Sequence, residues 1–525
     1  MIIRTIALAA SFALLSVLGA APAASAQDKV FRLVPASDLK YLDPLFTTNY
    51  VTRNFAHMVY ETLFAPDSQG VPQPQMVNSY SVSDDRLQWT FTLRTGLKFH
   101  DGSDVTAADA VASLKRWTAM DSYGRAMTAA GAQWMALDAT RFSLTLEKPF
   151  GLVLEALAKY SSLPPVIMPE RLIKAAGTGV VDDVVGSGPY MFKRDEWVPG
   201  NKVVFVRNPH YVGRKEAPSF LAGNRGGHLD RVEWIILPDS NSAAAALING
   251  EVDMIEQVPP DYIETLRKSP DVKILPAGAY QGALVVNQLH PPFDKPLARR
   301  ALLHAIEQKK FLTAMGYPKD LRMDHCATFF ICGGDDSTAG AEPFMKPDLA
   351  KAKQLLAASG YKGEKVVVLI PTDFQSLQGA GLVAVQTMKD IGMNVETQSM
   401  DWPSLVSRRV KKDRPDAGGW SAYATHGVAA SIDSPLNNFM LGAACGNSMP
   451  GWPCDKGLDE LRSQWMQETD PGKRRDVRDA FQRRAYEVAP YMPLGQFYGA
   501  TAVRKNIKHL ELQTGDVPMA WTFDK

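Results

Sequence analysis

The clearest pattern of hydrophobic and polar positions lies in residues 86–117, RLQWTFTLRTGLKFHDGSDVTAADAVASLKRW. Apolar and polar residues alternate from position 87 to position 94, a period of two that predicts a strand with one buried face. The sequence His-Asp-Gly at 100–102 predicts a turn, because glycine tolerates backbone angles that other residues avoid. Thr106 and Asp109 have the spacing of a capping box, with Asp in place of the usual Glu. They predict the start of a helix whose apolar residues share one face: Ala110, Val111, Leu114 and Trp117.

Strand and helix patterns alternate along the rest of the chain. Residues 31–34 predict a first strand, and the apolar positions 51, 55, 59 and 63 mark one face of a helix after it. A helix ending at Gly360 precedes the apolar strand KVVVLIP, and a long basic helix follows Asp470-Pro471. We expect the basic residues of that last helix to lie mainly on a solvated face. This alternation of strands and helices is typical of an α/β fold.

The first 26 residues have the pattern of a secretory signal peptide. Arg4 provides a positive charge, an apolar run covers residues 6–21, and Ala-Ser-Ala at 24–26 has the form of a cleavage site. A membrane anchor is the alternative, but the run is short for a span and contains Ser and Gly. No Cys lies at the cleavage site, so a lipid anchor is not expected. We therefore predict an exported, periplasmic protein.

Length and charge narrow the class of protein. A chain of 525 residues is too long for one hydrophobic core, and about two to four domains are expected. Lys and Arg total 57 against 56 Asp and Glu, which gives a net charge of +1. Nothing in this balance favours binding to nucleic acid or to an anionic membrane surface.

The cysteines form two local pairs in the sequence. An exported protein with this even count and spacing favours disulfides between Cys326 and Cys332 and between Cys445 and Cys454, although four cysteines allow three pairings. A zinc site that includes His325 is the alternative, but no pair of histidines has the spacing of a helical metal site.

Motifs of catalysis are nearly absent. The chain contains no G-x-S-x-G, H-E-x-x-H or Walker-type sequence, and no cofactor is indicated. Ser37-x-x-Lys40 fits the nucleophile motif of penicillin-recognising enzymes, but its S-D-N and K-T-G partner motifs are missing. His100-Asp101 is better explained as a turn between a strand and a helix. We therefore predict that the protein is not an enzyme.

Residues 90–117 closely resemble, without a gap, the signature segment of the family 5 solute-binding proteins, the peptide- and nickel-binding receptors of bacterial ABC importers. Further segments resemble that family in the same order along the chain. They include VGSGPY at 185–190, VVFVRNPHYVG at 203–213 and PPFDKPLARRALLHAI from residue 291. The resemblance covers essentially all of the chain after the signal peptide.

The resemblance implies a two-lobed α/β periplasmic binding protein of type II, in the large peptide-receptor subclass, with a hinge between the lobes. It implies a discontinuous lobe I made of residues 27–74, 186–282 and 496–525, and a lobe II made of residues 283–495. An extra small α/β subdomain would cover residues 75–185 and carry the signature. The solute would be buried between the closing lobes.

Two departures from the family pattern concern the solute. Peptide-binding members have an Asp after Trp-x-Ala that pairs with the peptide ammonium, whereas alignment on Gly419-Trp420 puts Tyr423 at that position. An insertion then delays the next Asp to Asp433, which would serve as the ammonium partner only if the inserted loop folds back into the cleft. Dipeptide receptors also have Arg and Tyr around the Pro at position 371, and Ile370 and Thr372 stand there instead.

Other predicted ligand contacts follow from the same resemblance. Tyr50 would lie on an inner loop near the solute, with a place at the edge of the core as the alternative. The glycines of VGSGPY, Gly188 among them, would admit either the ligand or another strand. In lobe II the predicted contacts are Asp373, Trp402, Arg408, Trp420, Ser421 and Tyr423, with His426 and Asn437 as further polar residues near the cleft. Core packing is the alternative for each of the two tryptophans, and a surface position is the alternative for Arg408 and its neighbour Arg409.

The sequence therefore predicts the solute receptor of an ABC importer, a monomer that delivers a small peptide-like or modified amine solute to a membrane permease and its ATPase. Nickel chelates, opines and oligosaccharides are alternative solutes within the same family. A sensory binding protein is the alternative from another functional class.

Overall fold

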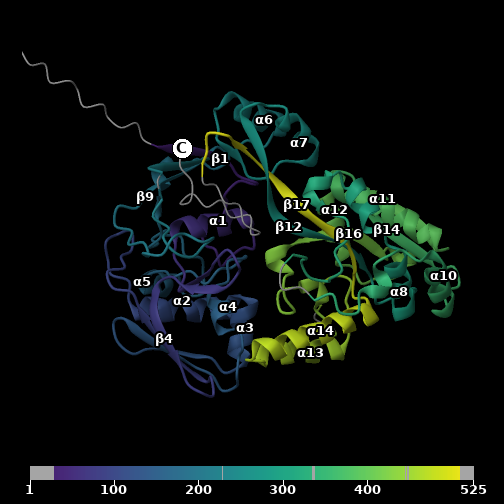
Figure 1. The fold of residues 1–525 in the computed structure, drawn as a ribbon, viewed down its shortest axis with the longest axis horizontal. Coiled ribbons are helices and arrows are strands. Elements are labelled where there is room, and N and C mark those ends of the chain that lie inside the picture. Colours follow the sequence, from purple (N-terminus) through teal and green to yellow (C-terminus); the bar gives the residue numbers. More distant parts are fainter. Residues whose placement is uncertain (1–28, 228, 334–336, 444, 446–447, 509–525) are drawn as a thin grey trace, which may run out of the picture.

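The computed structural model describes residues 29–227, 229–333, 337–443, 445 and 448–508. The predicted signal peptide lies outside the described residues. The chain forms two halves joined by the paired strands β12 and β17 (Figure 1). We call the half that contains the N-terminal strand lobe I and the other half lobe II. No described helix is long and apolar enough to span a membrane.

A large mixed sheet runs through both lobes. Its strands follow one another in space as β15 (Asn394–Met400), β14 (Lys365–Pro371), β16 (Ala422–Val428), β12 (Val272–Val286), β17 (Met492–Arg504), β11 (Met254–Ile255), β1 (Val30–Val34), β10 (Arg231–Ile235), β9 (Lys202–Arg207) and β8 (Tyr190–Phe192), with β13 (Arg322–Met323) on β17. In lobe I, β11, β1 and β10 are parallel, and in lobe II β14 is parallel to both β15 and β16.

The hinge strands β12 and β17 are antiparallel and belong to both lobes. Their register shifts twice, between Ala277 and Ala279 and between Gln281 and Ala283. Tyr280 lies between these two irregularities. Since bulges bend a strand and increase its twist, the chain is bent where it passes from one lobe to the other.

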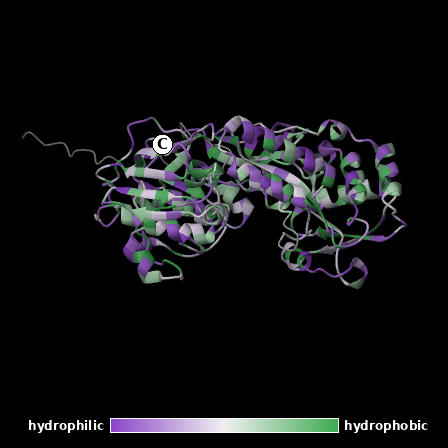
Figure 2. Cartoon of the chain, turned by 90° about the horizontal axis from the view of Figure 1, so that it is seen from below, coloured by the Kyte–Doolittle hydropathy of each residue, from purple (hydrophilic) through white to green (hydrophobic). Residues whose placement is uncertain are grey.

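Helices cover both lobes. Lobe I carries α1 (Tyr50–Val59), α6 (Ser240–Asn249) and α7 (Pro260–Arg267). Lobe II carries α8 (Pro296–Ala305), α9 (Gln308–Ala314), α10 (Leu349–Ala358), α11 (Gln375–Asp390), α12 (Trp402–Arg409), α13 (Lys456–Gln467) and α14 (Pro471–Val488). Figure 2 shows hydrophobic and hydrophilic positions alternating along the strands and helices of both lobes, which is the pattern expected of half-buried elements.

The family signature lies in a separate small antiparallel sheet. Its strands are ordered β4 (Val77–Val82), β5 (Gln88–Leu93), β7 (Arg141–Thr145) and β6 (Gln133–Ala136). Associated with it are α2 (Ala107–Met120), α3 (Ser122–Ala129), α4 (Val153–Leu157), α5 (Glu170–Ala176) and the hairpin β2 (Phe64–Pro66) with β3 (Pro72–Pro74). The predicted capping box is confirmed: Asp109 N donates to the Thr106 side chain, and Thr106 N donates to the Asp109 carboxylate.

Lobe II also touches this subdomain at the far end from the hinge. Trp465 of α13 is buried in the subdomain core, and Gly151 N donates to Met466 O at 2.8 Å. A Cβ at Gly151 would overlap with the carbonyl of Glu468, so only glycine allows the two backbones this close. The two halves are therefore in contact both at the hinge and at α13 (Figure 1).

Candidate functional site

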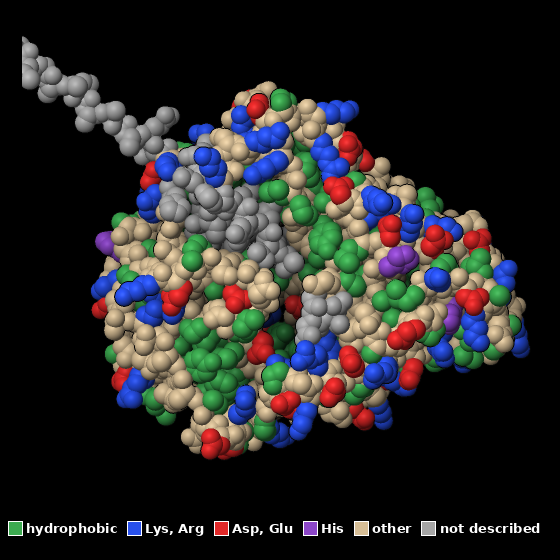
Figure 3. All heavy atoms as spheres, viewed as in Figure 1, with side chains coloured by type: hydrophobic (Ala, Val, Ile, Leu, Met, Phe, Trp, Pro, Cys, Tyr) green, Lys and Arg blue, Asp and Glu red, His purple; other side chains and the backbone are tan. Residues whose placement is uncertain are grey.

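Two cavities have walls from both lobes. The cavity beside α14, of about 460 Å³, is the α14 cavity, and the cavity beside the hinge strands, of about 640 Å³, is the hinge cavity. Both volumes fall within the roughly 300–1,000 Å³ of typical small-molecule sites. Figure 3 shows the surface hollowed between the two halves near the middle of this face.

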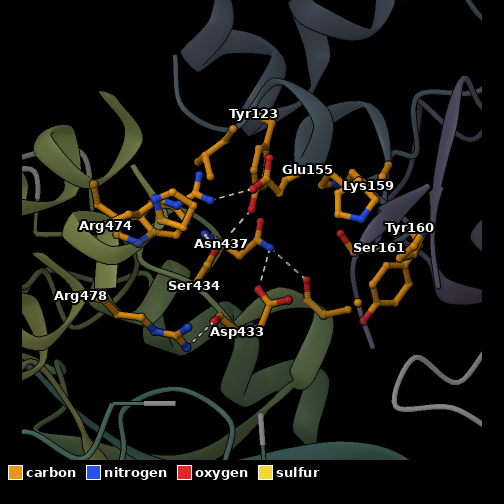
Figure 4. A pocket seen from close by; sticks show the side chains of 18 of the residues that line it. Tyr123, Glu155, Lys159, Tyr160, Ser161, Asp433, Ser434, Asn437, Arg474 and Arg478 are labelled. Carbon is orange, nitrogen blue, oxygen red and sulfur yellow. Dashed lines mark hydrogen bonds and ion pairs between the residues drawn. The ribbon is translucent and has the colours of Figure 1, made fainter. Parts of the chain in front are cut away.

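The α14 cavity is polar on both sides (Figure 4). Its subdomain wall includes Tyr123 of α3 and a run from α4 into the loop after it: Glu155, Lys159, Tyr160 and Ser161. Its lobe II wall combines the loop before α13 with one face of α14: Asp433, Ser434, Asn437, Arg474, Arg475 and Arg478. Charged and hydrogen-bonding groups therefore converge from opposite lobes.

The inserted loop does fold back into this cavity and carries Asp433 with it. The Asn437 side chain donates to Asp433 Oδ1 at 2.9 Å, and Arg478 donates to the main-chain oxygen of Asp433 at 3.0 Å. Burial raises the pKa of the Asp433 carboxyl, against the lowering effects of the Asn437 hydrogen bond and the positive charges of Arg478 and Lys159. Burial therefore outweighs these partners and disfavours the charged form of the carboxyl.

Contacts between the lobes surround the α14 cavity. Arg474 forms an ion pair with Glu155 at 3.0 Å and donates to Gly151 O at 2.7 Å. The hydroxyls of Tyr123 and Ser434 are 3.4 Å apart. Lys159, in the subdomain wall, is buried in an ion pair with Asp121 at 2.9 Å. The contacts of Arg474 and of Tyr123 exist only when the lobes are together, whereas the Lys159–Asp121 pair lies within the subdomain.

The hinge cavity lies where parallel strands end. The chain leaves β1, β10 and β11 of lobe I at this cavity, and β14 of lobe II ends at it from the other side. Ligands of α/β sheets bind outside the carboxyl ends of parallel strands, so this position is typical of a binding site. Asp38 follows β1 and Asp373 follows β14. His426 also lines the cavity, and burial lowers its pKa to about 4.

Three predicted ligand contacts lie instead in the core of lobe II. Tyr423 and Trp420 are fully buried with ring centroids 5.2 Å apart, in a cluster that includes Leu405 of α12. The Ser421 hydroxyl accepts from the main-chain nitrogen of Val367 at 3.0 Å. None of the three lines either cavity, because the alternation of β16 turns Tyr423 toward α12.

Other predicted residues have structural partners. Gly188 N donates to Val59 O at 2.8 Å, and a Cβ at Gly188 would lie 2.6 Å from the carbonyl carbon of Val59, so this glycine admits the end of α1. Arg408 donates to Gln398 and to Gly419 O. Neither Gly188 nor Arg408 lines the α14 or the hinge cavity.

The remaining predicted residues are close to the cleft. Tyr50 is the first residue of α1, and its hydroxyl lies 3.3 Å from the Ser431 hydroxyl of lobe II. Asp373 lines the hinge cavity and accepts from Trp402 N at 2.7 Å. Trp402 packs against Phe374 with ring centroids 5.8 Å apart. Asp433 and Asp373 thus line the two inter-lobe cavities, and Tyr50 bridges the lobes.

The sequence reasoning missed most of the polar wall of the α14 cavity. Arg474 and Arg478 belong to the helix whose basic face was expected to be solvated, yet both line the cavity. Their spacing of four residues puts them on one face of α14, but nothing in the sequence shows what that face contacts. Lys159, Tyr160 and Ser161 follow a short helix and carry no motif.

The structure joins Cys326 to Cys332 and Cys445 to Cys454, with Cα–Cα distances of 5.7 and 4.4 Å. Among the described residues, no group of three or more His, Cys, Asp or Glu side chains has the arrangement of a metal site. Cys326 is therefore held by a disulfide rather than placed with His325 as a zinc ligand.

Two lobes joined by a pair of strands, with cavities walled by both, define a periplasmic binding protein fold. The sequence agrees, because residues 71–449 match the bacterial extracellular solute-binding proteins, family 5 (middle). The chain belongs to this family. It is a non-catalytic solute-binding protein of the kind that serves ABC transporters.

Relatives and solved structures extend this likeness over nearly the whole chain. A probable peptide ABC transporter periplasmic-binding protein, y4tO of Sinorhizobium fredii, is 34% identical over 512 residues, or 96% of this chain and 95% of that one. The glutathione-binding protein GsiB of Escherichia coli K12 is 26% identical, covering 87% of each chain. The ABC transporter substrate-binding protein CtaP of Listeria monocytogenes has the same fold, with a TM-score of 0.80, 20% identity, and coverage of 95% of this chain and 99% of that one.

Proposed function

We propose that the protein is the exported receptor of an ABC importer and that it captures a small peptide-like or modified amine solute between its lobes. Its similarity to a probable peptide ABC transporter periplasmic-binding protein and to a glutathione-binding protein supports this class of solute. The periplasm is the proposed location, with residues 1–26 as a signal peptide. The proposed partners are a membrane permease and its ATPase, and the receptor itself would act as a monomer.

The observation that carries the proposal is the carboxylate of Asp433 in the α14 cavity. Burial raises the pKa of this carboxyl even though Asn437, Arg478 and Lys159 favour its charged form. A solute ammonium at this carboxylate would be a further partner for the charge and would offset the cost of burying it. Asp433 would thus pair with the solute ammonium, which is the role of the Asp that peptide-binding members have at the position of Tyr423.

The same cavity offers charges for the other end of a zwitterionic solute. Its lining includes Lys159, Arg474, Arg475 and Arg478 against the acidic Glu155 and Asp433. Arginine side chains bind carboxylates with good geometry, and several of them around one cavity favour an acidic group on the solute. A peptide-like molecule carries both an ammonium and a carboxylate.

The two walls of the α14 cavity come from different lobes, so solute binding there would favour closure of the lobes. Asp433 and the arginines belong to lobe II, whereas Lys159, Tyr160 and Ser161 belong to the opposite wall. A solute that touches both walls binds the closed form more tightly than the open form, and only such a difference shifts the population toward closure. The lobe boundaries proposed above place the hinge within β12 and β17.

The first experiment identifies the solute. The protein, purified under mild conditions and then denatured, would release co-purifying molecules for mass spectrometry, and ligand-stripped protein would be titrated with free, N-blocked and amidated peptides. We expect binding to require a free amino group and to weaken strongly in Asp433→Asn but not in Asp84→Asn, which removes an exposed carboxylate that lines neither cavity. Equal binding of N-blocked peptides, or of a nickel chelate or sugar in place of peptides, would contradict the proposal.

A further inference from the structure

The hinge cavity differs in chemistry from the α14 cavity. Among the described residues, its lining contains the acidic residues Asp38, Asp261 and Asp373 and no Lys or Arg. It also contains a group of aromatic side chains: Tyr262, Tyr280, Tyr317, Phe374, His426 and Phe497. Carboxylates combined with aromatic rings are the surroundings that stabilise an organic cation.

We propose that the hinge cavity is a binding site for an organic ammonium group with an apolar substituent, held between Asp38 of lobe I and Asp373 of lobe II.

The aromatic rings form a continuous set across the hinge. Tyr280 of β12 stacks on Phe497 of β17 with centroids 5.3 Å apart and ring planes 8° apart. Phe497 in turn stacks on Tyr317 at 4.1 Å. His426 of β16 lies perpendicular to Tyr280 at 5.5 Å and to Phe374 at 5.8 Å. The apolar substituent of an amine would therefore contact rings from both hinge strands and from lobe II.

Asp38 has capacity for a further partner. Its Oδ2 accepts from Gly200 N at 3.1 Å, whereas its Oδ1 is buried and has no hydrogen-bond partner among the described residues. A buried carboxylate oxygen without a donor is costly, and an ammonium N–H would satisfy it. Asp373 lines the same cavity, is exposed and uses Oδ1 to accept from Trp402 N; its second oxygen would accept from the ligand.

Positive charge from the protein does not compete strongly for this cavity. His426 has its pKa lowered to about 4 by burial and is therefore neutral at neutral pH. The N-termini of α6, α7 and α11 border the cavity, and helix N-termini favour anions. Each of these ends already has a carboxylate: Asp239 caps α6, Asp261 lies in the first turn of α7, and Asp373 lies two residues before α11.

The position of the two carboxylates couples binding to closure. Asp38 belongs to lobe I and Asp373 to lobe II, so the two carboxylates move with different lobes. Tyr280 lies between the two register shifts of the hinge strands, and its hydroxyl accepts from the Gln257 side chain of lobe I at 2.9 Å. A cation between the two carboxylates gains both of them only when the lobes are together. Its differential affinity then favours the closed form.

This site does not depend on what the α14 cavity binds. Asp433 does not line the hinge cavity, and neither Asp38 nor Asp373 lines the α14 cavity. The two cavities would hold either two parts of one long solute or two separate molecules. The proposal concerns only the chemistry of the group at the hinge.

The test uses two probes that differ in the sign of one charge, 3-phenylpropylamine and 3-phenylpropanoate, titrated calorimetrically into the full ligand-stripped chain. We expect the amine to bind and the carboxylate not to bind. In Asp38→Asn the amine should bind at least about tenfold more weakly, since a buried hydrogen bond to a charge is lost. In Asp373→Asn the loss should be about two- to fivefold, because this carboxylate is exposed.

Both substitutions retain the oxygen that accepts from Gly200 N or Trp402 N, so the fold should survive, and thermal unfolding of each variant checks this. Asp84→Asn is the matched control, because it removes an exposed carboxylate outside both cavities. If one of the two variants fails to fold, amine binding by the other variant tests the proposal.

Three results would overturn the inference. The first is no binding of the amine, and the second is tighter binding of 3-phenylpropanoate. The third is amine binding that is lost in Asp433→Asn but kept in both Asp38→Asn and Asp373→Asn, because the amine would then occupy the α14 cavity. This last result would leave the proposed receptor function intact while removing the hinge site.

Discussion

Asp433→Asn should have opposite effects on the free protein and on solute binding. The substitution keeps an oxygen that can accept from the Asn437 side chain but removes the charge. In the free protein, burial raises the pKa of the Asp433 carboxyl, so the charged form is less stable in the folded chain than in the unfolded chain. Removing that charge should therefore leave the free protein equally stable or slightly more stable at neutral pH.

The sign of the pH dependence follows from the same shift. Because the folded pKa lies above the unfolded value, the protonated carboxyl contributes stability below the unfolded pKa, and this contribution is lost as the pH rises through the folded pKa. Any gain in melting temperature from Asp433→Asn should thus be present at pH 7 and absent at pH 3. Thermal unfolding of the two free proteins across this range measures it.

Solute binding should change in the other direction. Removing one partner of a buried ion pair costs about 3–5 kcal/mol, and the partial exposure of Asp433 reduces this to about 2–3 kcal/mol. Affinity for a solute with a free amino group should then fall about 30- to 150-fold, at 1.4 kcal/mol per tenfold. Calorimetric titration at pH 7 measures this loss, with Asp84→Asn as the control.

Two results would refute this reasoning. One is a variant that binds an amino-group solute as tightly as the parent chain, which would mean that Asp433 is not the ammonium partner. The other is a free variant that melts several degrees lower at pH 7, which would mean that the Asp433 charge stabilises the closed loop instead of opposing it.

Three further outcomes are expected. Non-reducing peptide mapping should recover the pairs Cys326–Cys332 and Cys445–Cys454, and free thiols or stoichiometric zinc would contradict them. A solute at about 100 times its dissociation constant should stabilise the fold by roughly 2.7 kcal/mol and make the protein more compact in solution scattering; stabilisation without compaction would argue against closure. Tyr423→Phe should leave solute affinity unchanged within about twofold (about 0.4 kcal/mol), because Tyr423 lines neither cavity, and a larger loss would return Tyr423 to the site.

Local signals in the sequence determined the elements and the family. The capping box at Thr106 and Asp109 depends only on residues three positions apart, and it forms as predicted. The alternation from Leu87 to Leu93 likewise becomes β5, with Trp89 and Phe91 buried. Such features can be predicted from the sequence because their physical causes lie within one turn or one strand.

The residues that line the two inter-lobe cavities were predicted only in part. Asp433 and Asp373 were identified from the family pattern, and both line a cavity between the lobes. Tyr423 was assigned by aligning a short motif, but strand β16 turns it into the core of lobe II. A shift of one residue along a strand reverses the face on which a side chain lies, so motif alignment alone does not decide such a position.

Only the tertiary structure decided which surfaces meet. The sequence predicts a solvated basic face on α14. In the structure its arginines line a cavity, because the subdomain lies opposite, and Arg474 pairs with Glu155, which is 319 residues away in the chain. Asp38 and Asp373 are brought to one cavity by the parallel strands that precede them. Pairings at such separations depend on the packing of whole lobes, which no local pattern of hydrophobic and polar residues encodes.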